Sequence, residues 1–103
     1  MSTRERDVEG YLTRAIEAMG LECIKFIPDQ KNGMPDRLVL LPDERVVWVE
    51  LKTSSGSLSE IQKLQHVRLR RLGQRVEVVW TKEEADALAQ DLRTQLGIEE
   101  EGS

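Results

Sequence analysis

The 103-residue sequence has a single cysteine, a single histidine and few aromatic residues. Cys23 has no partner for a disulfide within the chain, and no cysteine and histidine cluster offers the four ligands of a structural zinc site. These absences fit a reducing compartment, the cytoplasm. Aromatic residues make up only 4% of the chain, which excludes the extended base-stacking platform that many single-strand nucleic-acid binders use.

Long apolar runs are also missing. The first residues lead directly into an amphipathic helical pattern with no apolar signal core, and no run approaches the ~18 residues needed to cross a bilayer. We therefore expect neither secretion nor membrane insertion. The length, with 39% hydrophobic and 33% charged residues, indicates one compact domain.

Charge is distributed unevenly along the chain. A net charge of −4 and an isoelectric point of about 5.1 argue against a uniformly basic protein that coats nucleic acid. Residues 83–103 contain seven acids and one base, however, so residues 1–82 carry a net charge of +2. We predict a folded domain over residues 1–97 and a disordered acidic tail over residues 98–103.

Three helices share one start signature, a serine or threonine followed three residues later by glutamate. In this capping box each of the two side chains binds the backbone N–H of the other residue. Apolar residues at helical spacing follow each cap, and a glycine ends each pattern. The predicted helices run from Ser2 to Gly20, from Ser57 to Gly73 and from Thr81 to Gly97.

Four runs rich in valine, isoleucine and tryptophan predict strands over residues 22–27, 37–41, 45–52 and 75–80. The turn at residues 42–44 makes the second and third strands an antiparallel hairpin. The third strand is apolar on both faces, as expected of a central strand covered by helices on each side. The order predicts an α/β fold, an αβββαβ core with a central mixed sheet flanked by helices, plus a C-terminal helix.

Polar residues interrupt the apolar pattern of this hairpin. Glu50 and Lys52 share one face at the end of the third strand, where burying charge is expensive. Pro35 restricts the backbone before the second strand and holds Asp36 at its entry. Antiparallel pairing can bring Asp36 beside Glu50, and a divalent cation would offset their repulsion. The alternatives are a solvated Glu50–Lys52 ion pair and an aspartate that orders a turn.

Two helical residues have similar positions. Glu9 lies on the flank of the apolar stripe of the first helix, so that its side of the helix looks toward the sheet, and Gln62 lies near the stripe of the second helix. The alternatives are an acid at the edge of the stripe and an amide that binds a backbone group. Oxygen ligands beside a lysine suit Mg²⁺ or Mn²⁺, and phosphodiester hydrolysis uses such a site.

These residues resemble a known family. Pro35-Asp36 and Glu50-Leu51-Lys52, on this order of elements, are similar to the PD-(D/E)xK nuclease superfamily. More narrowly, residues 4–81 resemble the virus-type replication-repair nuclease domain, VRR-NUC. The matching features are Glu9, Gly33-Met34-Pro35-Asp36, Val49-Glu50-Leu51-Lys52, Leu58-Ser59 with Gln62, Leu72-Gly73 and the strand Val76 to Val79.

The resemblance implies a restriction-endonuclease-like domain that hydrolyses DNA with Mg²⁺ or Mn²⁺. The implied metal ligands are Asp36, Glu50 and the backbone carbonyl of Leu51, with Glu9 in contact with the metal directly or through water. Lys52 would act on the nucleophilic water, and Gln62 would orient Lys52 or the phosphate.

The family resemblance further implies a bacterial or phage-encoded homodimer that cuts four-way DNA junctions, as Holliday-junction resolvases do. The alternatives are a nuclease or nickase of the same fold that acts on flaps or duplexes, and a non-catalytic DNA-binding module. Some basic residues could contact phosphates, although a solvated charged face is the alternative for each. The candidates are Lys31, Lys63, Arg68, Arg70, Arg71 and Arg75, with Arg4, Arg6 and Arg14 near the first helix. We assign no role to His66.

Overall fold

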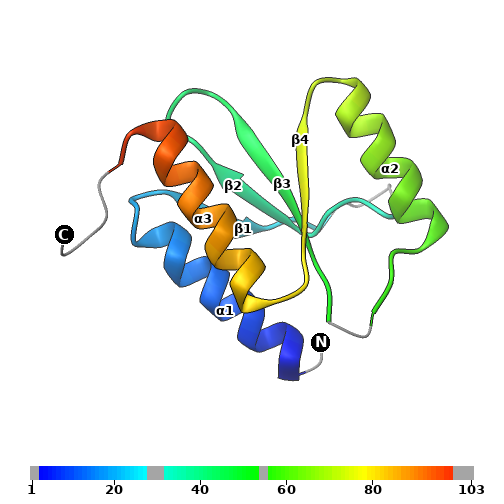
Figure 1. Cartoon of the computed structure of the whole chain (residues 1–103). Coiled ribbons are helices and arrows are strands. Elements are labelled where there is room, and N and C mark those ends of the chain that lie inside the picture. The colour runs from blue at the N-terminus through cyan, green and yellow to red at the C-terminus, as the bar shows by residue number, and fades with distance from the viewer. Residues whose placement is uncertain (1–2, 28–31, 54–55, 99–103) are drawn as a thin grey trace.

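A computed structural model of the chain describes residues 3–27, 32–53 and 56–98. Seven elements follow one another in the predicted order (Figure 1). They are α1 (Thr3–Glu17), β1 (Glu22–Lys25), β2 (Arg37–Leu40), β3 (Val46–Leu51), α2 (Glu60–Arg71), β4 (Arg75–Val79) and α3 (Lys82–Leu96). None of the helices in the described ranges is long and apolar enough to span a membrane.

The strands form one mixed sheet in the order β1-β2-β3-β4. β1 and β2 are antiparallel, and so are β2 and β3. β3 and β4 are parallel neighbours, and α2 connects them along the chain. A parallel pair requires a crossover connection, and α2 supplies it. The predicted α/β fold with a mixed sheet and a C-terminal helix is confirmed.

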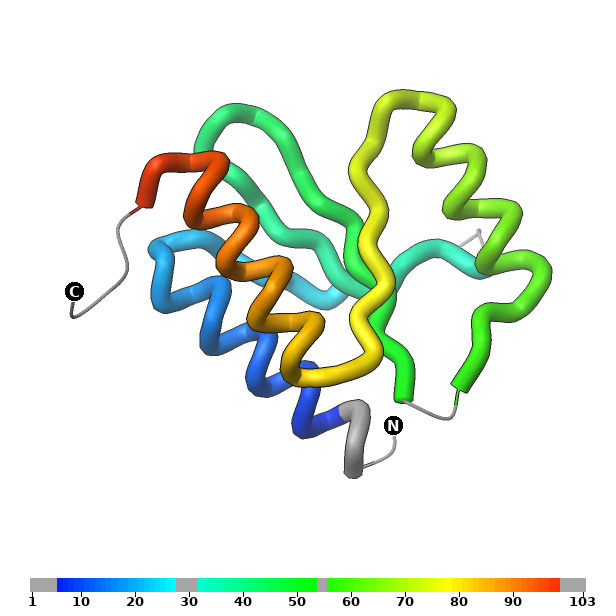
Figure 2. Tube along the Cα trace, in the orientation of Figure 1, coloured from blue at the N-terminus to red at the C-terminus, as the bar shows by residue number. Residues whose placement is uncertain are grey.

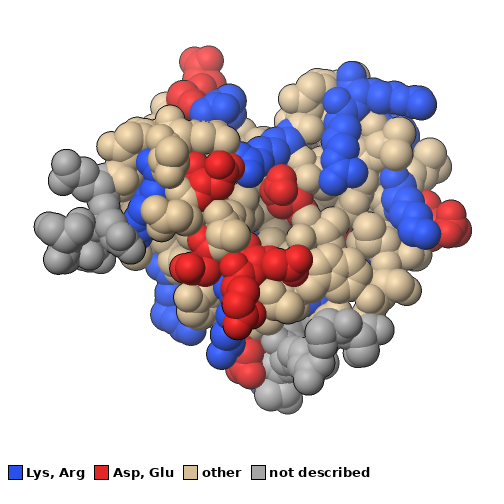
Figure 3. All heavy atoms as spheres, in the orientation of Figure 1, with Lys and Arg blue, Asp and Glu red and all other residues tan. Residues whose placement is uncertain are grey.

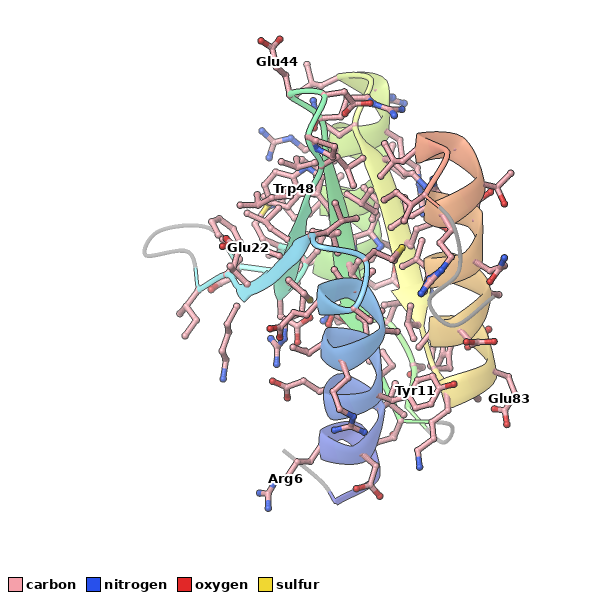
Figure 4. The ribbon with its side chains drawn as sticks, turned by 90° about the vertical axis from the view of Figure 1, so that its left-hand side faces the viewer. Arg6, Tyr11, Glu22, Glu44, Trp48 and Glu83 are labelled. Carbon is pink, nitrogen blue, oxygen red and sulfur yellow. The ribbon has the colours of Figure 1, made fainter. Side chains whose placement is uncertain are left out.

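The main core lies between the sheet and the pair α1 and α3, which pack side by side on one face (Figure 1). In Figure 4, Tyr11 lies between these two helices, and its hydroxyl donates to Asp86 Oδ1 at 3.4 Å. β3 contributes alternate residues to this core because strand side chains alternate between faces. These residues are Val47, Val49 and Leu51.

α2 covers the opposite face of the sheet. The β3 residues that alternate with the core set, Trp48 and Glu50, both bind glutamine side chains in or next to α2. Trp48 Nε1 donates to Gln74 Oε1 at 3.1 Å, and Gln62 Nε2 donates to Glu50 Oε2 at 3.4 Å. β3 is therefore central and covered on both faces, as its sequence predicts, and Glu50 lies beneath the start of α2.

The capping signals of two helices differ in outcome. Thr81 caps α3 as predicted, because its Oγ1 accepts the Glu84 N–H at 3.1 Å. The prediction that Ser57 caps the second helix is wrong, because α2 begins two residues later with Ser59 as its cap. Gln62 takes the position that the signature gives to glutamate, and its amide oxygen accepts the Ser59 N–H at 2.8 Å. The predicted cap Ser2 lies outside the described residues.

The C-terminal end of the domain follows α3 closely. Gly97 ends α3 in the left-handed conformation, with φ of 67°. Ile98 packs against the main core, and its N–H donates to the Arg93 carbonyl at 3.0 Å. The domain therefore includes Ile98, and the rest of the predicted acidic tail, residues 99–103, lies outside the described residues.

Candidate active site

The β2–β3 hairpin places Asp36 and Glu50 opposite one another. Arg37 pairs with Val49 in the antiparallel register, so the next step of the same register sets Asp36 against Glu50. Asp36 Oδ1 also accepts the backbone N–H of Leu51 at 3.2 Å. The structure thus sets Asp36 and Glu50 at the same register position, as hairpin pairing predicts, and the Leu51 N–H binds the Asp36 carboxylate.

Backbone contacts hold Asp36 firmly at the start of β2. Its carbonyl accepts the Phe26 N–H at 2.9 Å and Arg37 Nη1 at 2.8 Å, and Pro35 before it is buried. Burial raises the pKa of the Asp36 carboxyl above its usual value, while Arg37 and the Leu51 N–H oppose the rise. A carboxylate that is disfavoured by burial gains from a nearby cation.

Gln62 connects Glu50 to the start of α2. The Glu50 side chain is buried, at 4% exposure. The Gln62 amide oxygen is engaged by the helix cap, which fixes the orientation of the amide and directs its NH₂ toward Glu50. Gln62 therefore contacts Glu50, and the role that the family resemblance implies, to orient Lys52 or the phosphate, stays a prediction.

Lys52 follows Glu50 on the same face. Its backbone N–H donates to the Val79 carbonyl at 3.0 Å, which extends the pairing of β3 with β4 by one residue. Its half-buried side chain makes no ion pair or hydrogen bond with the residues that the structure describes. The ammonium is therefore available to water or to a phosphate beside the carboxylate pair.

His66 lies one helical turn after Gln62, on the same side of α2, and is 1% exposed. Within the described ranges its Nε2 has no hydrogen-bond partner. Burial lowers the pKa of the imidazole, and the charges of Arg70 and Lys52 lower it further. The lowered pKa favours the neutral imidazole, and Lys52 lies close enough for its charge to contribute to the shift. Its position after Gln62 was the only sequence signal for this arrangement.

Glu9 is held on the other face of the sheet. The resemblance implies that Glu9 contacts the metal directly or through water, and this stays a prediction. In the structure, Glu9 Oε1 lies 2.7 Å from Arg37 Nη2, and Nη1 of the same guanidinium lies 3.5 Å from Asp36 Oδ2. Among the described residues, no three carboxylate, cysteine or histidine side chains lie close enough to hold one metal ion together. Sequence reasoning missed Arg37, although a base inside an apolar strand next to Asp36 was a signal for it.

The loop before Asp36 packs directly on the first turn of α2 (Figure 2). Gly33 has φ of +82°, and a Cβ there would lie 2.8 Å from the Ile61 backbone. Gln65 Nε2 donates to the Asn32 carbonyl at 3.1 Å. This contact fixes the helix that carries Gln62 relative to the strand that begins at Asp36.

Replacing Gly33 with alanine is expected to destabilise the protein more than the same change at Gly20. Both glycines have φ of +82°, but nothing lies within 4 Å of a Cβ at Gly20. Left-handed strain alone costs about 1–2 kcal/mol, so we expect that loss of unfolding free energy for Gly20→Ala. Gly33→Ala should lose at least about 1 kcal/mol more, because a backbone must move. Urea unfolding of both variants measures the difference, and equal losses would contradict the packing role.

Basic side chains gather over α2, while acidic ones gather over the first half of α3 (Figure 3). Lys63 pairs with Glu60, Arg68 donates to Gln65, and Arg70 donates to the Val76 carbonyl. Arg71 is exposed at the end of α2. These four stay candidates for phosphate contact.

Other candidates for phosphate contact differ in position. Arg75 pairs with Glu77 and with Asp91, and it lies opposite Val47 at the end of β4 that is distant from Glu50. Its guanidinium is therefore less available than those on α2. Arg6 and Arg14 are exposed on α1, whereas Lys31 and the Arg4 side chain lie outside the described residues.

The donor chemistry of the site fits Mg²⁺ or Mn²⁺. Asp36 and Glu50 carry carboxylate oxygens at one register position of the hairpin, and Leu51, whose N–H binds Asp36, also carries a backbone carbonyl. These are hard ligands, and small divalent cations prefer them, with water completing the coordination. A cation held by two carboxylates and one carbonyl would have room for water and for a phosphate oxygen.

Comparison with known proteins gives two similar chains, and no family model matches the sequence. A curated protein named "Putative nuclease p44", from Acyrthosiphon pisum secondary endosymbiont phage 1, is 34% identical over 76 residues. The match covers 74% of this chain and 82% of p44. A solved structure described as "VRR_NUC domain" superposes with a TM-score of 0.79 at 31% identity, over 86% of this chain and 97% of that one.

Proposed function

The chain belongs to the VRR-NUC family of nucleases, and from this we propose that it is a divalent-metal-dependent DNA endonuclease selective for branched DNA, in particular for four-way junctions. The observation that carries the proposal is the grouping of Asp36, Glu50 and Lys52 at one end of the β2–β3 hairpin. Two carboxylates for a cation and one amine for water or phosphate are the groups that phosphodiester hydrolysis requires.

Asp36, Glu50 and the Leu51 carbonyl would hold Mg²⁺ or Mn²⁺. A cation bound there supplies Lewis-acid polarisation of the phosphoryl group and acidification of water. Asp36 is held for this role by its carbonyl contacts and by the Leu51 N–H. Gln62 keeps the Glu50 carboxylate in place through the cap of α2.

Lys52 would orient or deprotonate the attacking water. The amine can hydrogen-bond the attacking water, and its charged form would steady a phosphate oxygen. The half-buried side chain has no carboxylate partner in the described part of the chain that would have to be displaced first. Lys63, Arg68, Arg70 and Arg71 on α2 would contact the DNA backbone next to the site.

Junction cleavage leads us to propose a homodimer. A four-way junction is resolved by cuts in two symmetry-related strands, and each chain provides one site. A two-fold dimer sets two such sites in a fixed relation. Light scattering at micromolar concentration should therefore report a dimer. A monomer that still makes paired cuts would contradict this part of the proposal.

The substrate class is tested with four DNAs of one sequence: a four-way junction, a flap, a single strand and a linear duplex. With Mg²⁺ or Mn²⁺ present, we expect the junction to be cut at least about tenfold faster than the others. Preference for the flap or the duplex would replace junction selectivity with one of those activities. Binding of all four DNAs without any metal-dependent product would indicate a non-catalytic module.

A further inference from the structure

We propose that the buried guanidinium of Arg37 neutralises the charge of Glu9 next to Asp36. Glu9 is then a positioning residue and not a metal ligand, and each chain binds one divalent ion. The inference rests on the proposed function, because it concerns the metal that Asp36 and Glu50 would hold. It assigns to Glu9 a role different from the ligand role that the family resemblance implies.

One guanidinium joins the two acids directly. Arg37 Nη2 lies 2.7 Å from Glu9 Oε1, while Nη1 lies 2.8 Å from the Asp36 carbonyl and 3.5 Å from Asp36 Oδ2. The Arg37 side chain is only 3% exposed, whereas those of Glu9 and Asp36 are 29% and 36% exposed. The cation is thus buried beneath the carboxylates, where solvent screens it little.

The sheet register explains why Arg37 reaches Glu9. Arg37 pairs with Val49, which belongs to the core face that α1 and α3 cover. Asp36 follows the opposite alternation and shares its register position with Glu50. The Arg37 side chain therefore extends on the core face of the sheet to Glu9 on α1. The same guanidinium also donates to the backbone carbonyl of Asp36.

Arginine stays charged at any pH that a protein tolerates, so this internal cation is permanent. A second divalent ion between Glu9 and Asp36 would lie against the Arg37 guanidinium and be repelled by it. The absence of any three-carboxylate group of metal-binding size in the described part of the chain agrees with this. Glu9 is engaged by arginine instead.

The charge count of the site favours one ion. Glu9, Asp36 and Glu50 are balanced by Arg37 and Lys52 to a formal charge of −1. One divalent ion changes this to +1, which suits a phosphate. Two ions would give +3, enclosed partly in a low-dielectric interior, where like charges repel strongly.

The test is calorimetric titration of the metal-free, full-length protein with MnCl₂ in the absence of DNA. The wild type should bind one ion per chain. Glu9→Gln should weaken binding about tenfold, because the freed Arg37 charge then acts on Asp36 alone, an effect typical of groups outside the ligand shell. Glu9→Gln with Arg37→Gln should restore the affinity to within about threefold of wild type, because the excess cation is removed while a side-chain amide remains as a donor for the Asp36 carbonyl.

The double variant also guards against a folding defect, since Glu9 and Arg37 lose their charges together. Rescue in the double variant with one ion per chain supports the inference, because a ligand role for Glu9 predicts equal weakness in the single and double variants. Two ions per wild-type chain, or no rescue, would overturn it and leave the proposed nuclease intact. No Mn²⁺ binding to the wild type would overturn both.

Discussion

Lys52→Ala is expected to reduce metal-dependent cleavage by about 10²–10⁴-fold, the usual contribution of a positioned acid or base. DNA binding should weaken by less than about tenfold, because one phosphate contact among several is lost. The fold should persist, since no described residue depends on the Lys52 side chain for a hydrogen bond or an ion pair. Single-turnover cleavage and a binding titration in Ca²⁺ separate the two effects.

Lys82→Ala is the matched control for Lys52→Ala, because Lys82 is an exposed lysine at the start of α3. It should cleave as the wild type does.

An independent check of the Lys52 position uses the only histidine of the chain, His66. Loss of the Lys52 charge should move the pKa of His66 upward, toward its ordinary value. Normal cleavage by Lys52→Ala would remove Lys52 from the site.

Asp36→Asn is expected to abolish both metal binding and cleavage. Asparagine keeps an oxygen for the Leu51 N–H but removes the charge that would hold the cation. We expect cleavage to fall at least about 10³-fold, because the chemistry loses a metal ligand. Mg²⁺ should raise the unfolding temperature of the wild type and leave that of the variant unchanged.

The same substitution should leave the metal-free protein at least as stable as the wild type. Burial raises the pKa of Asp36, so its protonated form is favoured in the folded state more than in the unfolded state. That contribution to stability is present below the ordinary pKa and is lost as the pH rises through the raised one. A neutral asparagine escapes the loss at neutral pH. A large destabilisation without metal would contradict this description of the site.

Asp43→Asn is the control for the Asp36 variant. Asp43 is exposed in the turn between β2 and β3, at the opposite end of the hairpin, where Arg45 lowers its pKa. Its cleavage rate and its response to Mg²⁺ should equal those of the wild type. A comparable loss in both variants would point to a general effect of charge and not to a metal site.

The hairpin was the most predictable part of the structure, because its register follows from a short turn and from alternation along two strands. Residues 42–44 set the turn, and this alone places Asp36 opposite Glu50. The central position of β3 followed from apolar residues on both of its faces. Local rules were sufficient here, since both carboxylates lie within one supersecondary unit.

Contacts between distant elements were not predictable from the same rules. The pairing of Glu9 with Arg37 depends on how α1 crosses the sheet, and the approach of His66 to Lys52 depends on how α2 packs. Periodicity indicates which side of a helix is buried, but not which residue it meets. The predicted cap at Ser57 failed for a local reason, because Gln62 serves Ser59 as glutamate would.

The central claim is that Asp36, Glu50 and Lys52 form a metal-dependent nuclease site. The most direct measurement is the single-turnover cleavage of an end-labelled four-way junction by metal-free wild-type protein, before and after addition of MgCl₂ or MnCl₂. We expect no product in EDTA and prompt cleavage once either cation is added. An equal rate in EDTA would contradict the claim, as would the absence of product with both cations.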